Sequence, residues 1–500
     1  MKRPSHRSPE RDRNRASSSH ASDQRRPRRR PESDAENDQS EKDGAKKKYD
    51  NRGSFRGPLK AEPKPAGPAE PDGLAARRAA IDVVTMVEGE HTLDDALGFC
   101  HSFVDLEGSD RAFARALIAV MLRRRGSIDE AIGQYLSRPF PKRSRKAMHI
   151  LRCAAAQSLF LDMPAHAAVS TAVELAKAYR ETEGLAGVIN AIARKVATNG
   201  QSIVAKLPSR VDTASWLWRS WERSYGPAAA NAFAKVHRLQ PPIDLSFKPD
   251  EDLDKWAERI GADRVGAGSL RLRGEPTITH LPGFAQGAWW VQDAAAALPA
   301  KLFGDVKGLV AYDLCAAPGG KTMQLAAAGA KTTAVDQSSA RLKRLTANLE
   351  RTHLKADVVQ SDVLQFRPAG KADVILLDAP CTATGTIRRH PDVMWSKTQD
   401  QVDALKDIQS AMIDHAVSLL KPGGVLVYCV CSLQPEEAER QAEAALARHA
   451  NLSLAPVSPE ELGELSEAAT KSGTVRTTPA MLADKGGVDG FFAARFKLAS

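Results

Sequence analysis

The chain reads Asp313-Leu314-Cys315-Ala316-Ala317-Pro318-Gly319-Gly320-Lys321-Thr322 directly after the apolar segment 309–312. An apolar run followed by paired glycines indicates a strand that enters a tight turn and then a helix. Glycines at such a turn let the backbone approach a ligand, and the helix N-terminus supplies free N–H groups. A phosphate loop would need glycine where Cys315 stands, and the GxGxxG fingerprint of dinucleotide sites is also absent. We therefore expect a nucleoside ligand that carries no phosphate.

Beyond this turn, short apolar segments alternate with amphipathic ones as far as the C-terminus. This alternation is typical of a parallel sheet that helices cover on both faces. It predicts a doubly wound, Rossmann-like α/β domain over residues 301–500. The expected strands lie near 309–314, 332–336, 356–360, 373–378 and 424–430, the expected helices near 319–329, 338–351, 399–420 and 435–448, and a closing strand over 491–498.

Aspartates stand at or just after the ends of three expected strands. Asp336 ends the second strand, Asp362 follows the third and Asp378 ends the fourth. The carboxyl ends of parallel strands face one crevice, where such sheets bind ligands, and a carboxylate after the second strand can accept both ribose hydroxyls. Aspartate is also common in turns and at helix N-caps, but three aspartates at successive strand ends favour a shared ligand site.

Two cysteines lie at the same expected edge of the sheet. Cys381 follows 378–380 (Asp-Ala-Pro), and Cys431 ends the run Tyr-Cys-Val-Cys at 428–431. Most free cysteines are small buried hydrophobes, and Cys100 and Cys153, within expected helices, fit that interpretation. A thiolate beside a helix N-terminus has a lowered pKa and is a good nucleophile. The helix expected from residue 435 would act in this way on Cys431.

A thiolate, a carboxyl group and a methyl-donor site together suit the methylation of carbon-5 of cytosine. Carbon-5 becomes nucleophilic enough to attack a methyl sulfonium only after a nucleophile has added at carbon-6. An acid near ring N3 stabilises the developing charge, and Asp378 is placed for this role if it is protonated or shares a proton. A base must then remove the carbon-5 proton before the thiolate leaves.

The N-terminal segment differs in composition from the rest of the chain. Residues 1–72 are rich in Arg, Ser, Pro, Asp and Lys and poor in aromatic residues, so we expect a disordered basic tail. Residues 1–70 hold 19 lysines and arginines against 12 acidic residues, which accounts for most of the net charge of +10. The basic run 25–30 suits RNA phosphates, and it equally suits a solvated tail.

The segment between this tail and the α/β domain divides into two regions. Residues 73–205 carry apolar residues at helical spacing, which predicts an all-helical domain. The basic run 123–125 is expected to end one helix and to interact with its terminal carbonyls. Residues 206–300 are expected to form a mixed α/β linker and RNA-recognition subdomain, with short strands over 270–272 and 277–281.

Hydropathy and cysteine spacing over the whole sequence predict where the protein is located and whether it binds a metal. It has no apolar run of the roughly 20 residues that a membrane helix needs, and we expect no secretory signal, because no apolar segment directly follows residues 1–6. The six cysteines show no paired CxxC spacing, so neither a zinc site nor a disulfide scaffold is expected. We expect a cytoplasmic, monomeric protein with free thiols, without metal and without a membrane partner.

Three motifs in order resemble one family. Segments 313–322, 378–392 and 428–437 resemble the Sun family of S-adenosylmethionine-dependent RNA cytosine-5 methyltransferases, and the resemblance covers about 283–500. Residues 73–205 resemble NusB, an RNA-binding helical domain. This fusion implies a bacterial enzyme that methylates a cytosine in small-subunit ribosomal RNA, with S-adenosyl-L-methionine as its cofactor and RNA as its partner.

The resemblance also implies individual roles. Cys431 would be the nucleophile, Cys381 would assist release of the methylated RNA and could take part in the base step, and Asp378 would act on both the cytosine ring and the cofactor. Arg388, Arg389 and His390 resemble a substrate-side loop, which favours RNA contact over a solvated basic turn. The implied cofactor contacts are Cys315, Ala316, Ala317, Pro318, Gly319, Gly320, Lys321, Asp336, Asp362 and Asp378.

The chain departs from the family pattern at one point, just before the expected nucleophile. The family usually has Ala-Thr or Ser-Thr there, whereas this chain has Cys429-Val430, which puts a third thiol beside the site.

Three rival functions stay open at this point. DNA cytosine-5 methyltransferases share the Pro-Cys motif but use that cysteine as the nucleophile, and they lack an equivalent of Cys431. A methyltransferase that acts on tRNA or another RNA is the second possibility. The third is a non-catalytic RNA-binding or assembly factor that retains the fold.

Overall fold

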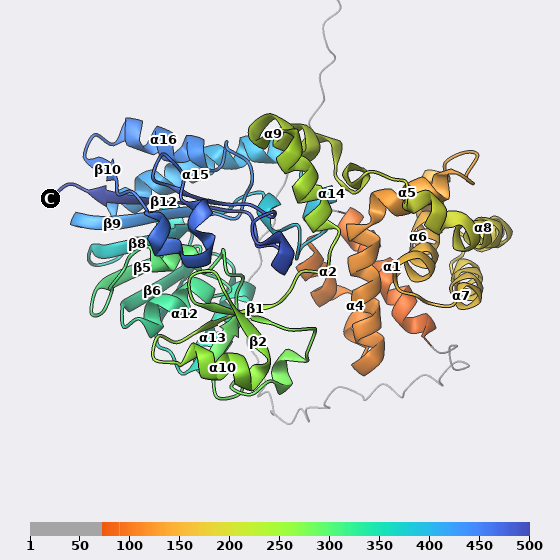
Figure 1. Cartoon of the computed structure of the whole chain (residues 1–500), viewed down its shortest axis with the longest axis horizontal. Coiled ribbons are helices and arrows are strands. Elements are labelled where there is room, and N and C mark those ends of the chain that lie inside the picture. Colours follow the sequence, from red (N-terminus) through yellow and green to blue (C-terminus); the bar gives the residue numbers. More distant parts are fainter. Residues whose placement is uncertain (1–72, 90) are drawn as a thin grey trace, which may run out of the picture. The chain divides into compact units, whose positions relative to one another are not determined.

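The computed structural model describes residues 73–89 and 91–500, which fall within one compact unit, 68–500. The tail expected over 1–72 lies outside the described residues. Figure 1 shows the chain with its elements labelled. None of the helices within the described ranges is both long enough and apolar enough to cross a membrane.

The first described region is all-helical, as predicted. Apolar residues at helical spacing, among them Leu151, Ala155 and Leu159, lie on one buried face and pack into a single core. The helices are α1 (Leu74–Glu88), α2 (Leu93–Phe99), α3 (His101–Val104), α4 (Gly108–Arg123), α5 (Arg125–Gly133), α6 (Arg145–Phe160), α7 (Ala165–Ala178) and α8 (Ala186–Val204), with short 3₁₀ turns η1 (Lys142–Ser144) and η2 (Glu183–Leu185) before α6 and α8.

The region that follows is mixed. After η3 (Ser209–Asp212) and the long helix α9 (Ser215–His237), four strands form an antiparallel sheet in the order β2-β3-β1-β4, accompanied by α10. The predicted strand over 277–281 is wrong, because this segment forms a 3₁₀ turn between Pro276 and Pro282, neither of which can donate a ladder hydrogen bond. The bounds are β1 Asp244–Phe247, α10 Leu253–Ile260, β2 Ala262–Val265, β3 Ser269–Leu272, η4 Ile278–His280 and β4 Trp289–Val291.

The C-terminal region is built on an eight-stranded sheet in the order β10-β12-β9-β8-β5-β6-β7, with β11 paired to β12. Strands β5 to β9 are parallel, as predicted, whereas β12 runs antiparallel between β9 and β10. Figure 1 shows this succession from β10 to β6. The strands are β5 (Val310–Leu314), β6 (Lys331–Asp336), β7 (Asp357–Gln360), β8 (Ala372–Asp378), β9 (Leu420–Val430), β10 (Leu452–Leu454), β11 (Val475–Thr477) and β12 (Phe491–Leu498).

Helices cover both faces of this sheet. Alternate residues of β8 show the division, because Ile375 and Leu377 pack with α15 and α16, whereas Val374 and Leu376 pack with α11 and α12. The helices are α11 (Leu298–Lys301), α12 (Gly320–Ala327), α13 (Ser339–Thr352), α14 (Val393–Ser396), α15 (Gln399–Ser418) and α16 (Glu439–Arg448). The doubly wound α/β fold is thus confirmed, although α16 begins at Glu439 rather than at the predicted 435.

Candidate active site

The carboxyl ends of β5, β6, β8 and β9 meet at one edge of the large sheet, on either side of the point where the strand order reverses between β5 and β8. Doubly wound sheets bind their ligands in this position. A cavity of about 300 Å³ opens at this edge. It is lined by Cys315, Asp336, Gln337, Arg341, Asp362, Val363, Asp378, Ala379, Pro380, Cys381, Ala383, Met412 and Cys431. The structure therefore brings the predicted thiols and aspartates together.

The glycine turn leads from β5 into α12 as predicted. Cys315 and Gly319 have positive φ angles of 62° and 103°. A Cβ on Gly319 would lie 2.9 Å from Cγ of Leu345, so glycine is needed for this close approach. Cys315 lines the cavity, and burial raises the pKa of its thiol, which keeps it protonated. The predicted contacts that are not among the lining residues are Ala316, Ala317, Pro318, Gly319, Gly320 and Lys321.

Two aspartates that line the cavity are held by backbone hydrogen bonds. Oδ2 of Asp336 accepts a hydrogen bond from the Ala317 amide at 3.2 Å, and Oδ1 accepts one from the Ser338 amide at 2.9 Å. Oδ1 of Asp362 accepts a hydrogen bond from the Leu364 amide at 2.8 Å and caps the turn η5 (Val363–Gln365). Each carboxylate thus has a structural role that fixes it, and its remaining lone pairs are available to a ligand.

Asp378 is half-buried and contacts two buried side chains, those of Lys321 and Cys429. Its Oδ2 accepts a hydrogen bond from Nζ of Lys321 at 2.8 Å, and Sγ of Cys429 donates to its Oδ1 at 3.6 Å. Burial opposes the charge of Lys321, but the carboxylate of Asp378 outweighs this and raises the pKa of the ammonium. Burial, and then the charge of Asp378, raise the pKa of Cys429, so its thiol keeps a proton to donate. Asp378 therefore has two donors, one of them cationic.

The two predicted catalytic thiols are direct neighbours. The Sγ atoms of Cys381 and Cys431 lie 3.5 Å apart. The hydrogen bond to Cys431, together with burial, raises the pKa of Cys381 well above its usual value. Cys381 therefore retains its proton beside the sulfur of Cys431. The expected helix N-terminus is not adjacent, because α16 begins eight residues after Cys431, at Glu439.

A carboxylate that the sequence did not single out links the two cysteine loops. Glu437 is fully buried and accepts hydrogen bonds from Thr382, the residue after Cys381, and from Ser432, the residue after Cys431. Burial raises the pKa of the Glu437 carboxyl, and the hydrogen bonds from Thr382 and Ser432 act in the opposite direction. The local pattern around Glu437 is a pair of acidic residues, which indicates a helix start, so a link between loops fifty residues apart could not be seen in it.

Arg388, the first residue of the basic segment 388–390, is positioned differently from the prediction. Arg388 is 1% exposed, and its guanidinium lies 2.7 Å from Asp293 and 3.2 Å from Asp489. Arg389 also binds Asp489, at 2.5 Å. The prediction that Arg388 contacts RNA is wrong, because its charge is buried and paired within the protein.

The loop that follows Cys381 also contacts the helical region. Nη2 of Arg123 donates to the carbonyl oxygen of Arg388 at 2.8 Å, and Nε1 of Trp395 donates to that of Leu122 at 2.8 Å. The amide of Leu93 donates to Oδ2 of Asp392 at 3.1 Å. The expectation that residues 123–125 interact with their own helix end is therefore wrong. Arg124 and Arg125 likewise pair elsewhere, with Asp212 and Glu88.

The residues at this edge fit S-adenosylmethionine, the cofactor that the resemblance implies. Asp336 and Asp362 offer carboxylate oxygens, which can accept hydrogen bonds from ribose hydroxyls or from an amino group. The lining arginine, Arg341, already contacts Asp336 at 3.4 Å and donates to the carbonyl oxygen of Ala317. The cavity thus presents acceptors rather than free cations, which suits a nucleoside with an amino-acid part better than a nucleotide.

Solved structures share this architecture. The crystal structure of PH0851 matches with a TM-score of 0.66 and 22% identity, and the match covers 85% of this chain and 98% of that one. The structure of NSun6 from Pyrococcus horikoshii with SFG matches with a TM-score of 0.50 and 19% identity, over 57% of this chain and 98% of that one. At these identities the likeness concerns the fold.

Sequence comparison identifies the family. Residues 305–497 match the model of 16S rRNA methyltransferase RsmB/F, and residues 74–198 match that of the NusB family. Ribosomal RNA small subunit methyltransferase B of Serratia proteamaculans is 34% identical over 365 residues, which cover 70% of this chain and 85% of that protein. The protein of the same name from Xanthomonas campestris is 33% identical over 371 residues, covering 70% and 82%. This chain belongs to the RsmB family of ribosomal RNA small subunit methyltransferases and carries a NusB-family domain ahead of the catalytic sheet.

Proposed function

We propose that this rRNA methyltransferase methylates carbon-5 of a cytosine in small-subunit ribosomal RNA through a covalent bond between Cys431 and carbon-6 of the base. The observation that carries the proposal is the placement of the Cys381 and Cys431 sulfurs 3.5 Å apart, on the same cavity as the three predicted aspartates. S-Adenosylmethionine is the cofactor, and when bound it supplies the electrophilic methyl group.

Cys431 carries the first step. Its thiolate adds to carbon-6, a sulfur–carbon bond forms, and the electron pair of the carbon-5–carbon-6 double bond becomes available at carbon-5. Negative charge then develops toward N3 and the carbonyl of the ring. Asp378 lines the cavity, and the Lys321 ammonium donates to its Oδ2 at 2.8 Å, which supports a role of this pair in relaying a proton toward the ring.

Cys381 acts in the last step. Once carbon-5 carries the methyl group, a base takes its proton and the electron pair of that carbon–hydrogen bond re-forms the carbon-5–carbon-6 double bond. The bond between Cys431 and carbon-6 breaks, and its electron pair returns to sulfur. The thiol of Cys381 holds a proton beside that sulfur, because its pKa is raised, and it can stabilise the departing thiolate by donating to it. The two thiols therefore have different tasks, attack for Cys431 and release for Cys381.

The Glu437 contacts support this division of roles. They anchor the residue after each cysteine on one buried carboxylate, which fixes the two loops relative to each other. Catalytic groups must be held close to their productive geometry, and misplacement by about 1 Å can cost two orders of magnitude in rate. Glu437 is thus a positioning residue in this proposal.

Two substitutions test the proposal in purified full-length protein. Cys431→Ala is expected to lower methyl transfer to rRNA by at least about a thousandfold, since it removes the nucleophile, while calorimetry still detects S-adenosylmethionine binding. Cys381→Ala is expected to form the adduct but to release it slowly, so that a protein–RNA species persists on a denaturing gel. Cys100→Ala is the matched control, because this thiol lies in the helical region.

The opposite pattern would overturn the assignment. A persistent adduct in Cys431→Ala, with activity lost in Cys381→Ala, would make Cys381 the nucleophile. Methylation mapped to a base atom other than cytosine carbon-5 would reject the reaction itself. Cofactor binding without transfer to any rRNA cytosine would favour a non-catalytic assembly factor.

A further inference from the structure

A second cavity, of about 860 Å³, lies in the helical region between the start of α6, the end of α7 and the start of α8. Its polar lining comprises Arg143, Ser144, Lys146, Tyr179, Arg180 and Glu181. We call it the α6 cavity. No step of the proposed reaction uses it.

Two arginines of the α6 cavity are without partners. Arg143 and Arg180 are exposed, and neither makes a hydrogen bond or an ion pair with any residue in the described ranges. Lys146 differs, because its Nζ lies 3.5 Å from Asp82 and 4.0 Å from the centre of the Tyr179 ring. Glu181 is the one carboxylate among the lining residues of this cavity. The lining is therefore cationic, and two of its guanidinium groups are free to bind an anion.

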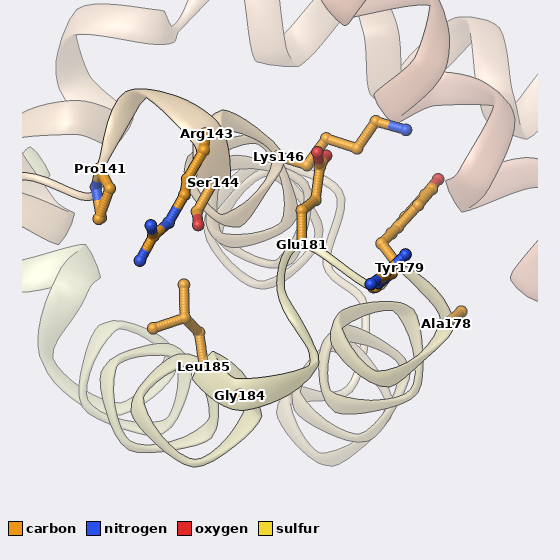
Figure 2. Close-up of a pocket in the computed structure, with 10 residues that line it drawn as sticks. Pro141, Arg143, Ser144, Lys146, Ala178, Tyr179, Glu181, Gly184 and Leu185 are labelled. Atoms are coloured by element: carbon orange, nitrogen blue, oxygen red, sulfur yellow. The ribbon is translucent and has the colours of Figure 1, made fainter.

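The Ser144 hydroxyl in the same lining also has no partner within the described residues. Ser144 is 5% exposed, and within the described part of the chain its Oγ makes no hydrogen bond, not even to cap α6. Figure 2 shows the Ser144 hydroxyl and the Arg143 guanidinium pointing into the same opening, opposite Leu185. The Ser144 Oγ is not among the fully enclosed polar atoms that lack a partner, so it is accessible from the opening and free to donate to a ligand there.

The charges around the start of α6 point to the same kind of ligand. The N-terminus of a helix carries partial positive charge and is stabilised by acidic residues or bound anions. The first turn of α6 has no acidic residue and begins instead with Arg145 and Lys146, which follow Lys142 and Arg143. Cations concentrated at a positive helix end repel one another, and an anion bound beside Ser144 would relieve that repulsion.

We propose that the α6 cavity binds phosphate groups of the RNA backbone, with Arg143, Arg180 and the Ser144 hydroxyl as the donors. Arginine offers a planar fork that matches phosphate oxygens, and serine hydroxyls commonly contact nucleic-acid phosphates. The volume far exceeds that of one phosphate ion, and the donors come from two separate segments, which suits a polyanionic chain. The identity of the RNA as the methylated substrate rests on the proposed function.

The test is equilibrium binding of small-subunit rRNA fragments to the full chain, measured by fluorescence anisotropy at several salt concentrations. Arg143→Ala and Arg180→Ala are each expected to weaken binding about three- to tenfold and to reduce the slope of log K against log salt by about 0.7 per lost phosphate contact. Ser144→Ala is expected to weaken binding less and to leave the slope unchanged, since it removes no charge. Arg210→Ala is the matched control, an exposed arginine outside the cavity lining, and is expected to change neither quantity.

Each contrary result has a distinct meaning. Wild-type affinity and slope in Arg143→Ala and Arg180→Ala would overturn the proposal. So would calorimetric binding of inorganic phosphate that these substitutions abolish while RNA binding is unaffected, because the cavity would then serve a free anion. The proposed reaction is tested separately, by identifying the methylated atom in the product of the wild-type protein. The affinity of each variant for S-adenosylmethionine checks that it is folded.

Discussion

The arginines near the active-site edge and those of the α6 cavity have opposite surroundings. Arg388 is buried and bound to two carboxylates, Asp293 and Asp489, whereas Arg143 and Arg180 are exposed and have no partner within the described ranges. Of these two regions, only the basic segment 388–390 draws attention in the sequence, whereas Arg143 and Arg180 do not. The structure assigns different roles to these arginines. A buried, paired arginine holds segments of the fold together, whereas an exposed, unpaired arginine is available to a ligand.

The largest expected effect comes from removing the buried arginine. Arg388→Ala leaves Asp293 and Asp489 in the interior with one cation fewer, and breaking a buried ion pair in this way costs about 3–5 kcal/mol. A clear fall in the melting temperature of the full chain is expected. Arg143→Ala is the matched control, since loss of an exposed, unpaired charge changes stability by no more than about 0.5 kcal/mol. Equal melting temperatures for the two variants would contradict the comparison.

A buried carboxyl near the active site provides a second test, through pH. Asp313 is fully buried, and burial raises its pKa from 3.8 to about 7 although Thr322 donates a hydrogen bond to it. The folded chain therefore keeps a proton that the unfolded chain releases, so this group's contribution to stability falls as pH rises from about 4 to about 7 and is constant above that. Each unit of such a shift corresponds to about 1.4 kcal/mol.

Asp313→Asn isolates this contribution. The amide oxygen of the variant can still accept a hydrogen bond from Thr322, and asparagine does not titrate. Between about pH 4 and pH 7 the melting temperature of the variant is therefore expected to fall less than that of the wild type. Identical pH profiles for the variant and the wild type would show that Asp313 is ionised in the fold. Asp254, an exposed aspartate of the antiparallel-sheet region, provides the control as Asp254→Asn.

The smallest effect is expected at Cys429, which had no role in the sequence interpretation. Its protonated thiol donates weakly to Asp378, so Cys429→Ala is expected to lower kcat for methyl transfer about three- to tenfold by loosening one side of that carboxylate. Cys429→Ser retains a donor and is expected to restore most of the activity. The readouts are kcat at saturating RNA and its pH profile. If kcat fell equally in both variants, the contribution of Cys429 would come from its packing and not from its hydrogen bond to Asp378.

Much of the fold and of the candidate site could be predicted from local sequence. The turn at 315–321 is marked by its glycines, and the positions of Asp336, Asp378 and Cys431 follow from strand ends, which short apolar runs define well. The antiparallel placement of β12 could not be predicted, because weak alternation over 491–498 indicates a strand but not its direction or its neighbours.

What escaped prediction depends on contacts between distant segments. Glu437 binds Thr382 across 55 residues, Arg388 binds Asp489 across 101, and Arg123 reaches Arg388 across 265. No local pattern distinguishes such residues from solvated charges. The role of a charged side chain here is decided by whether the fold brings an opposite charge to it, and this is information that only the tertiary structure holds.

The contacts between the helical region and the loop after Cys381 have a consequence for how the protein can evolve. Trp395, Asp392 and the backbone of Arg388 are all bound by residues of the first helices. A different RNA-binding domain placed ahead of the same catalytic sheet would leave these groups without partners, in the loop that follows the cavity-lining Cys381. The two modules are therefore expected to be inherited together and to change in step, so that chimeras made by joining them from distant relatives would lose activity before they lose cofactor binding.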